Sequence, residues 1–199
     1  MHASQPYPDG TVTFLFTDIE GSTLLWERDR EAMRRAVDRH LALIGEAVTA
    51  AGGVHFKTVG DAVQAAFHTA PDALDAAIAA QRALLAEPWP GEIGSLRVRM
   101  AMHAGTARVV DGDYLAPALN RLARTLGIGH GEQILVTEAA RGLLAGNLPP
   151  DVSLRSLGAH ALRGLQEPEE VFQVVAAGLR HDFPPLRSLP HHPTNLKVQ

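Results

Sequence analysis

An apolar stretch that stops at a carboxylate is the first place where this sequence could do chemistry. Residues 14–17 read Phe-Leu-Phe-Thr, Asp18 follows them, and Gly21-Ser22-Thr23 precedes a long helical pattern. Asp18 can hold a hard divalent cation, because such cations prefer oxygen ligands. The glycine turn can present backbone N–H groups at a helix start, where phosphate is favoured. The stretch therefore indicates a site for a metal ion and a polyphosphate, with helix capping by Asp18, Ser22 or Thr23 as the plainer alternative.

A second carboxylate is expected beside the first. Asp61 lies in a predicted tight turn between two strands, 54–59 and 62–67. The first of these strands follows strand 11–17 and a long helix, and such a unit favours a right-handed crossover with parallel strands. Parallel strands end at the same edge of a sheet, so Asp18 and Asp61 should meet there despite 43 residues of separation. Two divalent ions held by this pair would suit phosphoryl displacement.

Three further polar side chains could act on a phosphorylated substrate. Lys57 lies in an otherwise apolar strand, where it either has a function or extends from a sheet edge into water. Asn120 and Arg124 are four residues apart and share one face of a helix that is predicted to start near Pro117. Arg124 could bind a phosphate with two hydrogen bonds, or be an ordinary solvated arginine.

The remaining pattern completes an α+β sandwich with helices against a sheet. The other predicted elements are a helix with apolar residues from Met33 to Val48 that ends at Gly52-Gly53, a helix over Pro71–Leu85, a strand over Leu96–Gly105, a hairpin turn at Asp111-Gly112, a strand over Gln133–Val136, a helix capped by Thr137, and strands near 152–157 and 171–175. Residues 178–199 are rich in proline and show no periodicity, which predicts an extended tail or linker.

The composition limits the functional classes. The 199 residues are 46% hydrophobic and 20% charged with a net charge of −4, which fits one globular domain and argues against nucleic acid as a main partner. Without cysteine there are no disulfides and no thiol chemistry. No stretch approaches the ~20 apolar residues of a membrane span, so no membrane association is expected. We expect a cytoplasmic protein.

Together the dispersed polar residues resemble a known family. The sequence is similar to the class III nucleotidyl cyclases, specifically the bacterial adenylate cyclase catalytic domain, in the segments FTDIEGST (Phe16–Thr23), FKTVGDA (Phe56–Ala62), RMAMHAG (Arg99–Gly105), GDYLAPALNRLAR (Gly112–Arg124) and HGEQILV (His130–Val136). The resemblance covers about residues 10–177 and implies that residues 1–177 are the catalytic domain. It further implies a ferredoxin-like α+β sandwich with a mixed, mainly antiparallel sheet, active as a head-to-tail homodimer.

The resemblance assigns the metal and phosphate contacts of such a site. Asp18 and Asp61 would bind two divalent ions, Mg²⁺ or Mn²⁺, with help from the Ile19 carbonyl. The Gly21-Ser22-Thr23 turn would contact the phosphates. Arg163 stands where relatives often place a lysine that reaches the γ-phosphate, and the alternative for it is a surface arginine.

The resemblance also assigns the groups that bind the nucleoside. Lys57 and Asp113 would read the base, Asn120 would orient the ribose, and Arg124 would stabilise charge at the α-phosphate. In such cyclases the metal pair comes from one subunit and these four residues come from its partner. The reaction implied is attack of the ribose 3′-hydroxyl of ATP on the α-phosphate, which gives 3′,5′-cyclic AMP and pyrophosphate.

Hydrogen-bond chemistry favours adenine over guanine for this pair. Lysine only donates and an ionised aspartate only accepts, which matches the N1 acceptor and the N6 donor of adenine. One departure from the family pattern stands nearby, because Leu115-Ala116 replaces an aromatic residue and a glycine. The alternatives are a nucleotide-binding pseudo-cyclase that acts as a regulatory dimerisation module, and, more remotely, a diguanylate cyclase.

Overall fold

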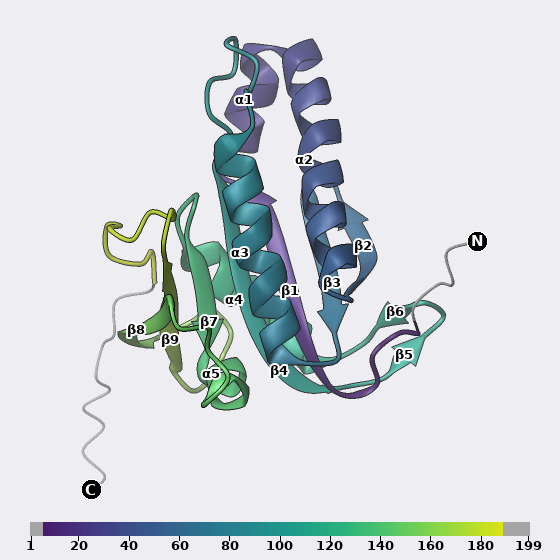
Figure 1. Cartoon of the computed structure of the whole chain (residues 1–199), viewed down its shortest axis with the longest axis vertical. Helices are drawn as coiled ribbons and strands as arrows, with labels where there is room; N and C mark the ends of the chain where they lie inside the picture. Colours follow the sequence, from purple (N-terminus) through teal and green to yellow (C-terminus); the bar gives the residue numbers. More distant parts are fainter. Residues whose placement is uncertain (1–5, 189–199) are drawn as a thin grey trace, which may run out of the picture.

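The computed structural model describes residues 6–188 and shows one sheet with helices on both faces (Figure 1). The strands are β1 (Gly10–Ile19), β2 (Val54–Val59), β3 (Ala62–Phe67), β4 (Val98–Ala107), β5 (Val109–Val110), β6 (Asp113–Tyr114), β7 (Ile134–Thr137), β8 (Val152–His160) and β9 (Glu169–Ala176). The helices are α1 (Ser22–Arg28), α2 (Arg30–Ala50), α3 (Ala70–Ala86), α4 (Pro117–Ile128) and α5 (Glu138–Leu144). No helix within residues 6–188 has the length and apolar character needed to cross a membrane.

The seven-stranded sheet has the order β2-β3-β1-β4-β7-β9-β8, and β5 and β6 form a separate hairpin. The β4–β7 pair is parallel, and the other neighbouring strands are antiparallel. The predicted α+β class with a mixed, mainly antiparallel sheet is confirmed. Since β1 and β2 both run antiparallel to β3, they run parallel to each other, as predicted, with β3 inserted between them.

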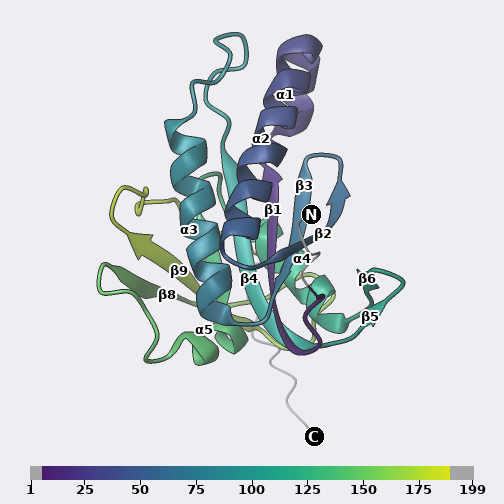
Figure 2. The ribbon, with the colours of Figure 1, turned by 45° about the vertical axis from the view of Figure 1, so that its right-hand side comes forward.

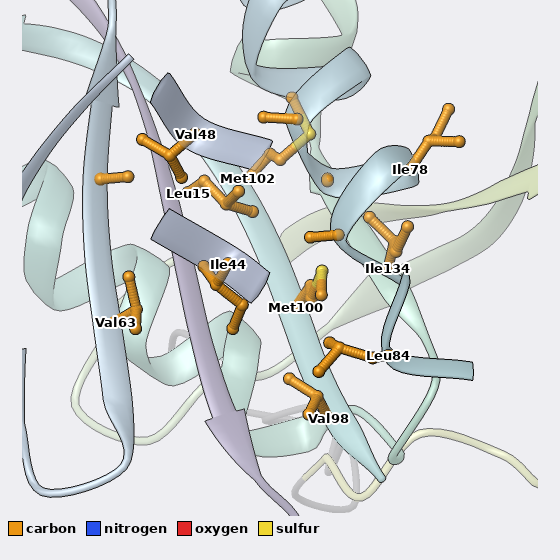
Figure 3. Close-up of a cluster of buried hydrophobic side chains, with 14 of the residues drawn as sticks. Leu15, Ile44, Val48, Val63, Ile78, Leu84, Val98, Met100, Met102 and Ile134 are labelled. Carbon is orange, nitrogen blue, oxygen red and sulfur yellow. The ribbon is translucent and has the colours of Figure 1, made fainter. Parts of the chain in front are cut away.

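Side chains of β4 alternate between two cores, as expected for a strand covered on both faces. Val98, Met100 and Met102 point into the core beneath α2 and α3, whereas Ala101 faces the core beneath α4. Figure 3 shows the first of these cores, where Ile44 of α2 packs toward the sheet. Figure 2 shows that α2 and α3 lie side by side over the sheet, and they make direct contacts. The sheet is thus fixed on both faces, which holds the ends of β1 and β3 in place.

Two sequence expectations differ from the structure. The long helical pattern after Gly21 is interrupted at Asp29, whose extended backbone (φ −156°) separates α1 from α2. Asp29 caps α2 because its carboxylate accepts the Ala32 N–H at 2.9 Å. Thr137 stands at the N-cap of α5, but the prediction that its side chain caps the helix is wrong. Its hydroxyl lies 2.8 Å from Nδ1 of buried His103 instead, because a buried imidazole needs a partner.

The buried imidazole of His103 should make folding pH-dependent. Burial, with a smaller contribution from the positive charge of Arg121, lowers the pKa of His103 from 6.5 to about 4. Between these values the unfolded chain takes up a proton that the folded chain refuses, so stability falls as the pH drops below 6.5. Between pH 7 and pH 5 the free energy of unfolding, measured with urea, should fall by about 2 kcal/mol more in the wild type than in His103→Asn. Equal losses in the two proteins would contradict this assignment.

Candidate active site

The two predicted carboxylates meet at the end of β1. The Ile19 backbone N–H donates to Oδ2 of Asp61 across the sheet, at 3.0 Å. Asp61 follows Gly60 in the β2–β3 turn, and the positive φ of that glycine (62°) closes the turn. Asp61 also helps to raise the pKa of Asp18, as expected for two carboxylates held near each other. The strand directions therefore predicted this meeting correctly.

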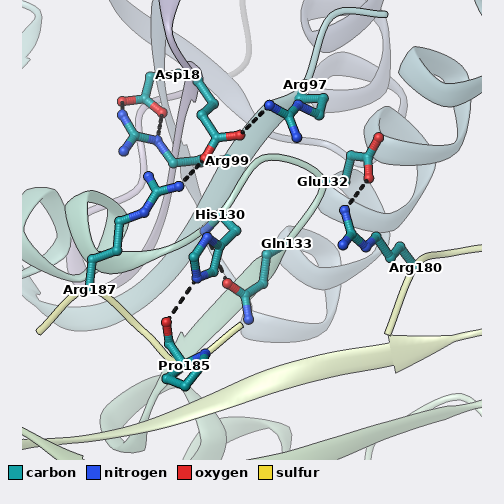
Figure 4. A network of polar contacts seen from close by, with 10 residues as sticks. Asp18, Arg97, Arg99, His130, Glu132, Gln133, Arg180, Pro185 and Arg187 are labelled. Atoms are coloured by element: carbon teal, nitrogen blue, oxygen red, sulfur yellow. Dashed lines mark hydrogen bonds and ion pairs between the residues drawn. The ribbon is translucent and has the colours of Figure 1, made fainter. Parts of the chain in front are cut away.

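Asp18 is paired with an arginine that the sequence analysis did not assign to the site. Arg99 of β4 faces Asp18 in the sheet register and donates to both carboxylate oxygens, from Nε at 2.7 Å and from Nη2 at 2.5 Å (Figure 4). Burial raises the pKa of Asp18, and Arg99 offsets part of that increase. The sequence shows that Arg97 and Arg99 alternate with apolar residues and so share one face of their strand. Only the pairing of β4 with β1 shows that Arg99 lies opposite Asp18.

The carboxylates suit a hard divalent cation. Asp18 near the end of β1 and Asp61 in the β2–β3 turn both offer carboxylate oxygens, and their mutual repulsion is the kind that a cation relieves. Within residues 6–188 no group of three or more histidine and acidic side chains forms a complete metal cage. A cation here would therefore take its further oxygens from the backbone, from water or from a phosphorylated ligand, which is the usual situation for Mg²⁺.

The turn after the carboxylate is free of side-chain caps. Gly21 is the N-cap of α1 in the left-handed conformation (φ 71°), and no side chain hydrogen-bonds to the first turn. The plainer alternative, in which Asp18, Ser22 or Thr23 caps the helix, is therefore wrong. Ser22 is half-buried and Thr23 is exposed, so the first turn of α1 is accessible to a ligand.

A buried histidine hydrogen-bonds to the backbone of Asp61. His40 of α2 is fully buried, and its Nε2 donates to the Asp61 carbonyl at 3.0 Å. Burial lowers its pKa, with the Asp61 carbonyl acting in the opposite direction, so the imidazole stays neutral. Its Nδ1 has no hydrogen-bond partner among the described residues. In the sequence, His40 occupies an ordinary core position of a helix, so no sequence signal points to this hydrogen bond.

Lys57 and Asp113 lie together beside the edge strand β2. Lys57 of edge strand β2 forms an ion pair with Asp113 of the β5–β6 hairpin, and both side chains are partly exposed, 44% and 35%. The rings of Phe56 and Tyr114, the neighbours of this pair in the chain, pack edge-to-face at 4.9 Å and bring the two elements together. Lys57 and the Tyr114 N–H lower the pKa of Asp113, which keeps it an ionised acceptor.

The remaining predicted residues, on α4 and after β8, are exposed. Asn120 and Arg124 are on the solvent face of α4, and Arg163 is in the β8–β9 connection. Within residues 6–188, no hydrogen bond links Asp18 or Asp61 with any of these three residues, or with the pair formed by Lys57 and Asp113. The described contacts therefore connect two groups of predicted residues: Asp61 with Ile19, next to the Asp18–Arg99 pair, and Lys57 with Asp113.

Comparison with known proteins identifies the family. The profile of the adenylate and guanylate cyclase catalytic domain matches residues 4–176. The chain belongs to this family. Its catalytic domain is of the class III cyclase type, which uses divalent metal ions and includes both adenylate and guanylate cyclases. Family membership alone therefore leaves the choice of nucleotide open.

Individual relatives support this assignment. An uncharacterised protein of Mycobacterium tuberculosis is 39% identical over 191 residues, which cover 95% of this chain and 64% of that protein. An adenylate cyclase of Schizosaccharomyces pombe is 36% identical over 154 residues, covering 65% of this chain and 9% of that protein. A structure of an adenylate cyclase from Trypanosoma brucei in its monomeric state has a TM-score of 0.82 at 29% identity, and the match covers 94% of this chain and 99% of that one.

Proposed function

We propose that this cyclase domain is an adenylate cyclase, which converts ATP to 3′,5′-cyclic AMP and pyrophosphate. The Lys57–Asp113 ion pair is the observation that supports the choice of nucleotide. A permanent donor and an ionised acceptor lie next to each other at the protein surface, in the arrangement that the N1 and N6 positions of adenine require. Guanine presents a carbonyl oxygen where adenine has its amine, so Asp113 would face a lone pair. A mismatch of this kind at a closed site rejects a nucleotide strongly.

The chain's own residues bind and orient the substrate in this proposal. Asp18, Asp61 and the Ile19 carbonyl would hold two divalent ions, which would supply charge stabilisation at the reacting phosphate and activation of the attacking hydroxyl. The uncapped turn at Gly21-Ser22-Thr23 would bind the phosphates with its N–H groups. Arg99 stays beside these groups as a permanent positive charge. The ribose 3′-oxygen attacks the α-phosphorus, the bond to pyrophosphate breaks, and the hydroxyl proton leaves to solvent.

The nucleoside contacts would come from a second copy of the chain. Asn120 would orient the ribose and Arg124 would neutralise charge at the α-phosphate, and among residues 6–188 neither forms a hydrogen bond with Asp18 or Asp61. A head-to-tail homodimer would unite the carboxylate half-site of one copy (Asp18 and Asp61) with the helix α4 half-site of the other (Asn120 and Arg124) and form two equivalent active sites. Large apolar side chains exposed around these half-sites are consistent with such an interface: Leu24 (70%), Val59 (55%), Val110 (49%) and Leu115 (78%). Arg163 at the γ-phosphate and a cytoplasmic location, where ATP is available, complete the proposal.

The proposal is tested by product formation. Purified protein is incubated with ATP or GTP and with Mn²⁺ or Mg²⁺, and both cyclic nucleotides are quantified. We expect cyclic AMP from ATP and little cyclic GMP from GTP. Cyclic GMP as the main product would overturn the choice of base. Tight ATP binding without any cyclic product would instead identify the pseudo-cyclase, for which the Leu115-Ala116 departure gives a reason.

A further inference from the structure

The residues that follow β9 form no helix or strand within the described range, yet they lie along the domain. The imidazole of His130 stacks on Phe183, with ring centroids 6.3 Å apart and planes 10° from parallel. Nε2 of His130 donates to the Pro185 carbonyl at 3.0 Å. The Arg187 backbone N–H donates to the carbonyl of the last residue of α4 at 2.9 Å. We call residues 180–188 the strap, and these contacts fix the place from which its Arg187 side chain starts.

That side chain reaches the loop at the end of β1. Nη2 of Arg187 lies 2.5 Å from Oε1 of Glu20, while Nη2 of Arg97 lies 3.3 Å from Oε2. Figure 4 shows Arg97 and Arg187 approaching one carboxylate from two directions. The Glu20 side chain is only 13% exposed. Gly131 makes this burial possible, because a Cβ at that position would lie 2.8 Å from Oε2 of Glu20.

Glu20 lies within the loop that is proposed to bind the cations and the phosphates, so its contacts bear on that site. It stands between Ile19, whose carbonyl is proposed to bind a cation, and Gly21, which opens the proposed phosphate turn. Its carboxylate is a negative charge beside a site for a polyphosphate, and it would repel that ligand unless it were neutralised. Arg187 and Arg97 together neutralise it and hold it turned toward the strap. Arg187 therefore acts on the charge of the loop and on its order.

We propose that Arg187 is a positioning residue for the phosphate loop, residues 19–23, and that the strap thereby belongs to the functional site. The inference rests on the proposed function, since it takes that loop to bind the nucleotide phosphates. The family profile ends at residue 176, so the strap lies outside the residues that the profile matches. Arg187 touches neither the base nor the reacting atoms. It acts through Glu20, so its loss should weaken nucleotide binding more than it slows the chemical step.

Hydrogen exchange and kinetics on the full chain test this proposal. Arg187→Ala should make amide exchange in residues 19–23 about 10-fold faster, because opening of the loop becomes easier. It should raise KM for the ATP complex by about 5- to 10-fold, with kcat changed by less than about two-fold. Arg187→Lys keeps the charge, so its exchange rates and its KM should lie between those of Arg187→Ala and those of the wild type. Arg34→Ala is the matched control, since Arg34 is an exposed arginine that pairs with Glu31 on α2.

A double variant separates charge compensation from general loosening. Glu20→Gln removes the charge that Arg187 compensates, so adding it to Arg187→Ala should recover part of the KM. The proposal would be overturned if Arg187→Ala had the amide exchange rates and the KM of the wild type. It would also be overturned if the double variant had a higher KM than either single variant. The exchange measurement needs no turnover. An inactive wild type whose loop still loosens in Arg187→Ala would refute the proposed function alone, whereas an active wild type with an unchanged variant would refute the strap alone.

Discussion

Replacing Asp61 with asparagine is expected to lower cyclic nucleotide formation by about 100- to 1,000-fold without disturbing the fold. Asparagine keeps an oxygen that can accept the Ile19 N–H, now at 3.0 Å from the carboxylate, so the contact between the β1 end and the β2–β3 turn survives. It removes the negative charge that a divalent cation needs. Asp61→Ala removes both the charge and the acceptor, so it should be equally inactive and less stable by about 1 kcal/mol.

The comparison of these two variants separates metal binding from loop structure. Rates with saturating Mn²⁺ report the first, and urea unfolding reports the second. Asp38→Asn is the matched control, because Asp38 is an exposed carboxylate (67%) that pairs with Arg34 on its own helix. Full metal-dependent activity in Asp61→Asn would remove Asp61 from the proposed metal site.

Mixing inactive variants tests whether the half-sites belong to different subunits. Asp61→Asn disables the carboxylate half-site and Arg124→Ala disables the helix α4 half-site. A heterodimer of the two retains one composite site with both halves intact, so the mixture should regain up to about a quarter of wild-type activity if the chains associate at random. An inactive mixture in which heterodimers are demonstrably present would mean that each site is built within one chain.

The features that the sequence predicted depend on strand direction and on side-chain chemistry. Asp18 and Asp61 meet because β1 and β2 point the same way, which the crossover rule for a strand-helix-strand unit predicted. The insertion of β3 between those strands did not affect the argument. The sequence also predicted an extended tail or linker over residues 178–199: residues 178–188 form no helix or strand, residues 189–199 lie outside the described residues, and the division at residue 178 stays a prediction. The family resemblance named Lys57 and Asp113 as the two residues that read the base; the structure joins them in an ion pair, and the base-reading role stays a prediction.

The features that the sequence did not reveal are contacts between distant segments. Arg99 opposes Asp18 only through the β1–β4 register, and a shift of one residue would turn it to the other face. His40 supports Asp61 from a helix whose apolar pattern is ordinary, so only the packed structure shows its hydrogen bond. The Arg187–Glu20 ion pair joins residues at opposite ends of the chain, and no local pattern predicts such a contact.

The double variant Lys57→Glu, Asp113→Ser is expected to change the ratio of kcat/KM for ATP to kcat/KM for GTP by about one to four decades. The estimate follows from two hydrogen bonds of roughly 1–3 kcal/mol each at a closed site, at about 1.4 kcal/mol per decade. Lys57→Glu supplies acceptors for the N1 and N2 donors of guanine. Asp113→Ser removes the charged acceptor that would face the guanine O6 and can donate to it instead.

Because Lys57 and Asp113 contact each other, the single variant Lys57→Glu and the double variant should differ in how well they bind a nucleotide. Lys57→Glu alone places a second carboxylate against Asp113 in the free protein, and this like-charge pair should impair binding of either nucleotide. The double variant relieves that repulsion, so it should use GTP better than Lys57→Glu does, although Leu115 and Ala116 limit the gain. We expect loss of ATP turnover to exceed the gain of GTP turnover. Steady-state kinetics of the four proteins with both nucleotides decide the matter, and an unchanged ratio in the double variant would mean that Lys57 and Asp113 do not read the base.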